Sequence, residues 1–181
     1  MTFQIFKRKM SRMAVLVCVS LFGAVVNASA QENQMLRLIN QSLEKLQQPS
    51  PDALLTCVAE LKRIEVMFPD SVQPKFQAAL QSLNYAVMNP QADQTEPLLA
   101  DAERLIDGMA GMKQADESDV CTLRGFLYMV RIVQNPAQNG QRYYLDVLQN
   151  YERALAVNPQ NELARMLKER FMEGMRTATG N

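Results

Sequence analysis

The sequence predicts an all-α fold of about seven helices, and three observations support this. After residue 30, apolar residues recur every three or four positions along almost the whole chain, which is the spacing of one face of an α-helix. Glycine is scarce, at 7 of 181 residues, and turn-dense β architectures need more of it. Breaks in the helical pattern coincide with proline, as at Pro69 and Pro159, because proline ends helices.

Seven apolar stripes define the expected helices. The stripes lie within residues 35–46, 54–68, 72–87, 98–109, 120–133, 144–155 and 163–175. Ser50 and Pro51 precede the second stripe, where they suit the N-cap and the first helical position. The Pro69 break separates the second helix from the third, and a polar run ending at Thr95 separates the third from the fourth.

The remaining boundaries follow from similar signals. Residues 116–119 are Asp-Glu-Ser-Asp, which supplies a cap and favourable negative charge for the fifth helix. Residues 134–140 are rich in Pro, Gly and Asn and are predicted to form a loop before the sixth helix. The seventh helix, residues 161–176, is expected to cap the C-terminal end, and its polar face carries Lys168, Glu169, Arg170 and Glu173.

The N-terminus has the pattern of a secretory signal peptide. Four basic residues within 7–12 precede an almost wholly apolar run at 13–26, and Ala28-Ser29-Ala30 resembles a cleavage site. A transmembrane anchor would need about 20 apolar residues. Lipid attachment at Cys18 is not expected, because Leu and Val precede it in the middle of the run. We therefore predict cleavage after Ala30, export to the periplasm or beyond, and no stable membrane insertion of the mature domain, residues 31–181.

Composition excludes several functions. The chain has 19 basic and 19 acidic residues and no His. The signal takes four of the basic residues and none of the acidic ones, so 15 basic and 19 acidic residues remain, a net charge of −4. This charge gives no reason to expect nucleic acid as a partner. Without His, Ser-His-Asp and Cys-His catalysis and the commonest zinc ligand are all missing.

The acidic pairs and the cysteines do not suggest a site either. Asp101 with Glu103 and Asp116 with Glu117 are interpreted as solvated charges or helix starts, because acid catalysis needs a carboxyl group with a shifted pKa in a pocket. Cys57 and Cys121 lie on helices expected to be non-adjacent, so we expect no disulfide and two free buried thiols. The sequence therefore predicts no enzyme, no cofactor and no metal site.

One stretch resembles a known helical repeat. Tyr151, Ala154 and Pro159 have the spacing of the second helix of a tetratricopeptide repeat, and Gly125 and Tyr128 match the small and aromatic positions of the first. Arg124 stands where that family has Leu. The two helices are also farther apart in sequence than in the family, and we assign the extra residues to the loop predicted at 135–140.

The rest of the mature chain fits the same family more loosely. Residues 50–69 place Cys57, Leu61, Ile64 and Pro69 at corresponding positions, and residues 72–112 fit as a helix pair. The resemblance to small secreted tetratricopeptide-repeat proteins of Gram-negative bacteria implies antiparallel helix pairs stacked as a short α-solenoid. It also implies an inner surface that binds a peptide or protein.

The densest group of candidate contact residues lies on the fifth and sixth helices. Arg124, Tyr128 and Arg131 are spaced i, i+4 and i+7, so they share one helix face. Arg142 and Tyr143 follow at the start of the next stripe. Arg and Tyr are enriched at protein-binding hot spots. In the alternative interpretation, Tyr128 packs between helices and the arginines pair with acidic neighbours.

Two functions follow from these observations. The first is an exported, non-enzymatic interaction or scaffold module that binds a protein or peptide through tetratricopeptide-like repeats. The alternative is a closed helical bundle that binds a lipid or another small apolar ligand.

Overall fold

The structure is a computed structural model that describes residues 29–48 and 50–179, with side chains as far as residue 177. The basic segment and apolar run of the predicted signal, residues 1–28, lie outside the described residues. The chain divides into two compact units, Met1–Asn40 and Gln41–Asn181. Residues 29–44 are helical, so the predicted cleavage site after Ala30 falls at the beginning of this helical stretch.

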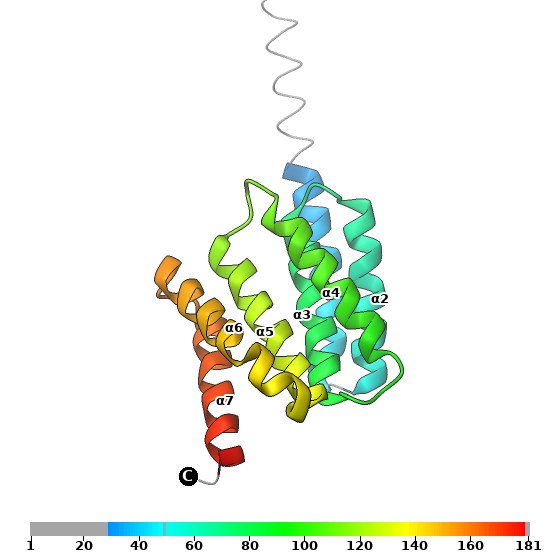
Figure 1. Cartoon of the computed structure of the whole chain (residues 1–181). Helices are drawn as coiled ribbons and strands as arrows, with labels where there is room; N and C mark the ends of the chain where they lie inside the picture. Colours follow the sequence, from blue (N-terminus) through cyan, green and yellow to red (C-terminus); the bar gives the residue numbers. More distant parts are fainter. Residues whose placement is uncertain (1–28, 49, 180–181) are drawn as a thin grey trace, which may run out of the picture. The chain divides into compact units, whose positions relative to one another are not determined.

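All regular structure in the described part of the chain is helical, and seven α-helices form as predicted (Figure 1). The helix of residues 29–44 runs into a short 3-10 turn, η1. The later elements are η1 (Lys45–Gln47), α2 (Pro51–Met67), α3 (Val72–Met88), α4 (Thr95–Ala110), α5 (Glu117–Gln134), α6 (Pro136–Val157) and α7 (Glu162–Thr179).

Two predicted caps are present. The Ser50 hydroxyl accepts a hydrogen bond from the Ala53 amide at 3.1 Å, and Pro51 occupies the first turn of α2. The Asp116 carboxylate accepts from the Ser118 amide at 2.7 Å at the start of α5. Such bonds satisfy amide groups that have no partner within the helix.

The predicted loop at 134–140 is wrong. Asn135 alone separates α5 from α6, and residues 136–140 form the first turns of α6. The Asn135 side chain accepts from the Gln138 amide at 3.2 Å, and Pro136 takes the first helical position. Asn is a strong N-cap and Pro is preferred at the first position, so this dipeptide starts a helix here. The residues predicted to form a loop therefore lengthen α6.

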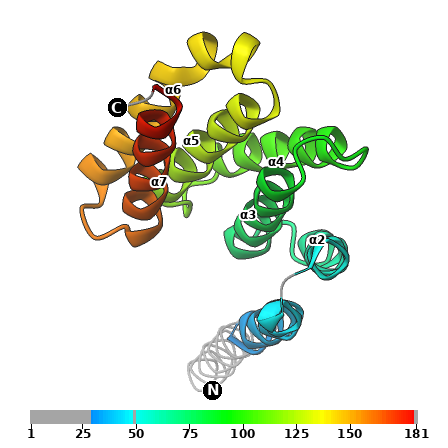
Figure 2. The ribbon, with the colours of Figure 1, turned by 90° about the horizontal axis from the view of Figure 1, so that it is seen from below.

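Within the second unit, the helices pack in chain order. Each of α2 to α6 contacts the helix that follows it, and the next-nearest contacts are α2 with α4, α3 with α5 and α5 with α7. Among α2 to α7, no helix contacts another more than two places away. This pattern of local contacts is repeat-like. Figures 1 and 2 show α5 lying between α3 and α7.

The core of the second unit is built from the predicted stripes. All five stripe residues of α2 and its C-cap, and all six of α4, are buried; they are Leu54, Val58, Leu61, Ile64, Phe68, Leu98, Leu99, Ala102, Leu105, Ile106 and Met109. Helix α5 is buried on more than its predicted stripe, because Phe126, Met129 and Ile132 are also buried. This wider burial follows from the position of α5, which contacts α3, α4, α6 and α7.

Candidate functional site

The structure brings the five predicted contact residues together across α5 and α6. The rings of Tyr128 and Tyr143 stack, with centroids 5.3 Å apart and planes 11° from parallel. The Arg142 guanidinium lies 4.9 Å from the centroid of the Tyr143 ring, within the range of a cation–π interaction. Arg124 and Arg131 lie on α5 one turn before and one turn after Tyr128.

Two arginines of this cluster form ion pairs with acidic residues of α4. Arg124 Nη2 donates to Asp107 Oδ1 at 2.7 Å, and Arg131 Nη1 donates to both carboxylate oxygens of Glu96 at 2.6 and 2.8 Å. Arg131 holds the pKa of Glu96 below its usual value through these bonds. Burial alone would lower the pKa of Arg124, but the Asp107 carboxylate raises it overall. These two arginines therefore join α5 to α4. Arg142, Tyr128 and Tyr143 instead form a contact between α5 and α6.

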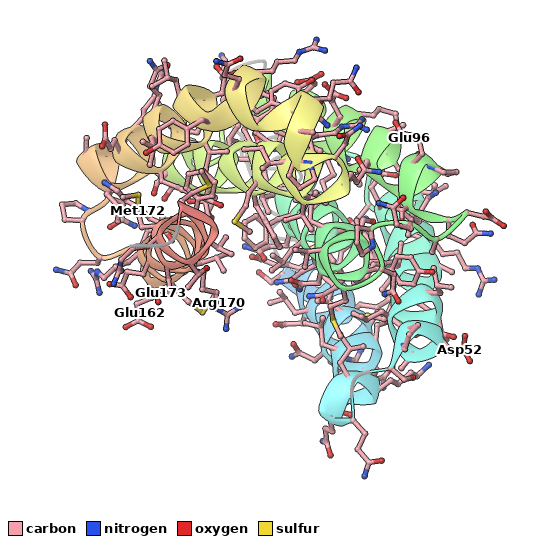
Figure 3. The ribbon with its side chains drawn as sticks, turned by 60° about the horizontal axis from the view of Figure 1, so that its bottom comes forward. Asp52, Glu96, Glu162, Arg170, Met172 and Glu173 are labelled. Carbon is pink, nitrogen blue, oxygen red and sulfur yellow. The ribbon has the colours of Figure 1, made fainter. Side chains whose placement is uncertain are left out.

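A second feature is an apolar groove of about 470 Å³ between α3, α5 and α7. Its lining is mostly aliphatic, aromatic or sulfur-containing, and it consists of Asn84, Val87, Phe126, Met129, Ile132, Val133, Pro136, Leu167, Arg170, Phe171, Gly174 and Met175. Helices α3 and α7 both pack on α5, and the groove lies between them. Figure 3 shows the side chains on the two sides of this space.

Few polar residues line the groove. Arg170 is its single charged lining residue, and Asn84 is bonded to the Gln81 side chain at 3.0 Å. In the part of the chain that the structure describes, Arg170 is exposed and forms no ion pair or hydrogen bond. Its neighbour Glu173 pairs with Arg176 at 2.6 Å. Arg170 projects from α7 and is labelled in Figure 3.

Gly174 also distinguishes the groove. It lies within α7, where glycine costs about 1 kcal/mol relative to Ala. A Cβ built at Gly174 would have nothing within 4 Å, so no close helix–helix contact in the described structure requires glycine there. The missing side chain instead leaves space in the groove.

A second apolar hollow lies between α6 and α7. Its volume is about 570 Å³, and Tyr144, Leu145, Met172 and Met175 contribute its apolar lining. Leu145 is 63% exposed and Met172 is 41% exposed. Met175 lines both cavities, so the C-terminal half of α7 has open apolar surface on two sides.

The groove was not predicted from the sequence. Leu167, Phe171 and Met175 belong to the apolar stripe within residues 163–175, and Val133 ends the stripe within residues 120–133. Leu167 and Phe171 are buried, whereas Val133 is 39% exposed at the groove. A sequence signal did exist, because α5 carries apolar residues outside its main stripe, at Phe126 and Met129. A helix that is apolar on several faces contacts several neighbours.

The other expected sites can be located as well. Cys57 on α2 and Cys121 on α5 are buried and free, and these helices do not contact each other. Burial, together with the Glu60 charge, raises the pKa of Cys57 to about 11, and burial also raises that of Cys121. Both thiols therefore stay protonated at neutral pH, which makes them poor nucleophiles.

The acidic pairs have structural partners. Asp101 pairs with Lys62 of α2, and Glu117 pairs with Arg153 Nη2 at 2.5 Å. Across residues 29–48 and 50–179, no three His, Cys, Asp or Glu side chains are grouped as metal ligands would be. Within the same residues, every helix is too short or too polar to cross a bilayer.

Comparison with known proteins adds no assignment. No family model, no curated protein and no solved structure matches this chain.

Proposed function

We propose that this chain is a non-enzymatic interaction module of tetratricopeptide-like helical repeats that binds a segment of a protein partner in the groove between α3, α5 and α7. The observation that carries the proposal is the groove itself, an open apolar surface bordered by three helices that are nearly apolar along it. Apolar grooves between helices are a recurring mode of peptide recognition. The proposal includes export, on the strength of the signal-like pattern within residues 1–30.

A small apolar ligand is the second candidate. Its support is the volume of about 470 Å³, which lies within the range of small-molecule pockets. A ligand of this class would be recovered with the protein after organic extraction, whereas a protein segment would be recovered by crosslinking.

The experiment places a photoreactive amino acid at Val133, which lines the groove and is partly exposed. Crosslinking in the expressing cell then identifies what lies against it. The blocking variant is Gly174→Met, which extends a side chain into the groove from a position with free space. Gly108→Met on α4 is the matched control, because a Cβ at Gly108 also has nothing within 4 Å and this residue does not line the groove.

The expected result is a discrete protein adduct at Val133 that Gly174→Met abolishes and Gly108→Met preserves. An adduct unaffected by Gly174→Met would contradict the groove as the binding site. Lipid in the extract that disappears with Gly174→Met, without any protein adduct, would establish the second candidate instead.

The arginine–tyrosine cluster is a separate candidate surface. Reversing the charge of Arg124 and Arg131 would also break their ion pairs with α4. A loss of binding would therefore not distinguish a lost partner contact from a disturbed fold. Arg142→Ala is the cleaner test, because Arg142 is exposed and contacts Tyr143 within its own helix. Loss of the adduct in Arg142→Ala with unchanged thermal stability would assign this surface to the partner.

A further inference from the structure

We propose that the occupant of the groove is an amphipathic helix of a protein partner, whose apolar stripe lies between α3, α5 and α7 and whose flanking carboxylate pairs with Arg170. This inference rests on the proposed function and specifies the chemistry of the partner. Its three supports are the dimensions of the groove, the charge on its edge and the space at Gly174.

The dimensions match about two helical turns. On α5 the lining residues run from Phe126 to Val133, and on α7 they run from Leu167 to Met175. With a rise of 1.5 Å per residue, these spans are about 10 and 12 Å. Apolar residues at i, i+4 and i+7 of a bound helix would extend over about 10 Å. The walls of the groove are helices, which offer no sheet edge for a bound strand.

The charge on the edge selects the sign of the partner. Arg170 is the one charged residue among the groove lining. The only charged residue of α3 is Lys75, and its Nζ is already bonded to the Pro69 carbonyl at 2.5 Å and lies 3.1 Å from Glu65 Oε1. An incoming carboxylate would therefore find a guanidinium without a competing acid among the lining residues. Arginine binds carboxylates through two parallel hydrogen bonds.

The space at Gly174 admits a second helix at close range. A side chain there would stand in the groove, and none of the surrounding residues comes within 4 Å of the Cβ position. The same substitution that blocks the groove should therefore leave the fold intact. Met is also a better helix former than Gly, so a loss of binding in Gly174→Met is not expected to arise from unfolding; thermal unfolding of the variant checks this.

The test uses a displayed library of amphipathic helices of about 18 residues, long enough to be helical in isolation. Positions i, i+4 and i+7 vary among apolar residues, and the flanking positions vary among Glu, Gln and Lys. The library is selected against the purified full chain and against its Arg170→Glu, Arg63→Glu and Gly174→Met variants. Arg63, an exposed residue of α2 outside the groove lining, controls for the change in net charge.

The expected result is enrichment of Glu at a flanking position. A selected Glu peptide should bind the unaltered chain about three- to tenfold more tightly than its Lys counterpart, the size of an exposed ion pair replaced by a repulsive one. Arg170→Glu should invert this preference and Arg63→Glu should retain it. Gly174→Met should bind neither peptide.

Two outcomes separate this inference from the function on which it rests. If helices are enriched and blocked by Gly174→Met but show no Glu preference, or keep it in Arg170→Glu, the inference about charge is overturned and the groove stands. If no helix is enriched over the Gly174→Met background, the amphipathic occupant is overturned, while the crosslinking experiment at Val133 decides the proposed function separately.

Discussion

Tyr151 of α6 lies directly against Gly125 of α5. A Cβ at residue 125 would be 2.8 Å from Tyr151 Cε1 and 2.9 Å from Cδ1, closer than side-chain carbons pack. The ring is fully buried, which raises the pKa of its hydroxyl, and that hydroxyl lies 3.9 Å from the sulfur of Met129. Because Met129 lines the groove, this contact links the packing of α5 on α6 to the position of a groove residue.

Gly125→Ala should destabilise the chain. The added methyl group would push the Tyr151 ring from its place, at a net cost of about 1–2 kcal/mol after the gain in helix propensity. Urea unfolding followed by circular dichroism measures the change. Gly108→Ala is the matched control, because its Cβ meets open space. This substitution should raise the free energy of unfolding by about 0.5–1 kcal/mol. Equal stability of the two variants would show that the Tyr151 ring can move without cost.

Asn161→Ala should destabilise the start of α7. The Asn161 side chain accepts from the Ala164 amide at 3.0 Å, and its Nδ2 donates to Ser118 Oγ at 2.8 Å. Loss of a cap and of a buried hydrogen bond should cost about 2 kcal/mol in free energy of unfolding. The neighbouring exposed Gln160→Ala should change stability little. A small effect of Asn161→Ala in urea unfolding would mean that water replaces the amide in this network.

Asp119→Asn should stabilise the chain at neutral pH. Burial raises the pKa of Asp119 and the nearby Asp116 charge raises it further, while a hydrogen bond from Asn161 lowers it. A raised pKa in the folded state means that the folded chain is favoured when the carboxyl is protonated, and that this contribution is lost as the pH rises through the folded-state pKa.

The advantage of Asp119→Asn should therefore be largest at pH 7 and disappear as the pH falls towards about 4, the ordinary value for Asp. Urea unfolding across this pH range measures it, with exposed Asp93→Asn as a control for the loss of one surface charge. An advantage that grows at acid pH would have the opposite sign and would refute this account.

Lys75→Met should be costly on its own and less costly together with Glu65→Leu. Lys75 Nζ lies 3.1 Å from Glu65 Oε1, and both side chains are at most 15% exposed. Removing the ammonium leaves a mostly buried carboxylate without its partner, at about 3 kcal/mol. Replacing both members removes that charge. A double-mutant cycle in urea measures the coupling, and additive costs would show that the carboxylate finds water once Lys75 is gone.

A chain that ends at Pro159 should aggregate. Helix α7 packs on α5 and α6, and its Ala164, Leu167 and Phe171 side chains are buried. Its absence would leave apolar surface of α5 and α6 exposed, as in a repeat array without its terminal cap. Size-exclusion chromatography and thermal unfolding check this expectation. A monodisperse chain that unfolds as cooperatively as the full one would remove the capping role from α7.

The sequence predicted the helices well because their signals are local. Stripe spacing and the caps at Ser50 and Asp116 depend on neighbouring residues alone, and the structure has both caps. The wrong prediction of a loop at 134–140 also used only local signals. Asn135 and Pro136 are common in loops and equally suited to starting a helix. Which role they take depends on whether the following turns can pack, and residues 143–151 of α6 do pack on α5.

The candidate site was harder to predict from the sequence than the helices were. Spacing along α5 correctly placed Arg124, Tyr128 and Arg131 on one face. The acidic partners of the arginines lie 17 and 35 residues earlier, on α4. The groove depends on α3 and α7 both packing on α5. These relationships are set by tertiary packing, which single-helix periodicity does not encode.

The central place of α5 has a consequence for the order in which the chain acquires its structure. Helices α3 and α4 both contact α5, yet α5 is synthesised after them. In any process that delivers the chain from its N-terminus, such as synthesis or passage through a translocation channel, the surfaces of α3 and α4 that α5 covers must wait for it to emerge. A pause after residue 116 would prolong that exposure, so the interval between α4 and α5 is where a holding chaperone would have the greatest effect on yield.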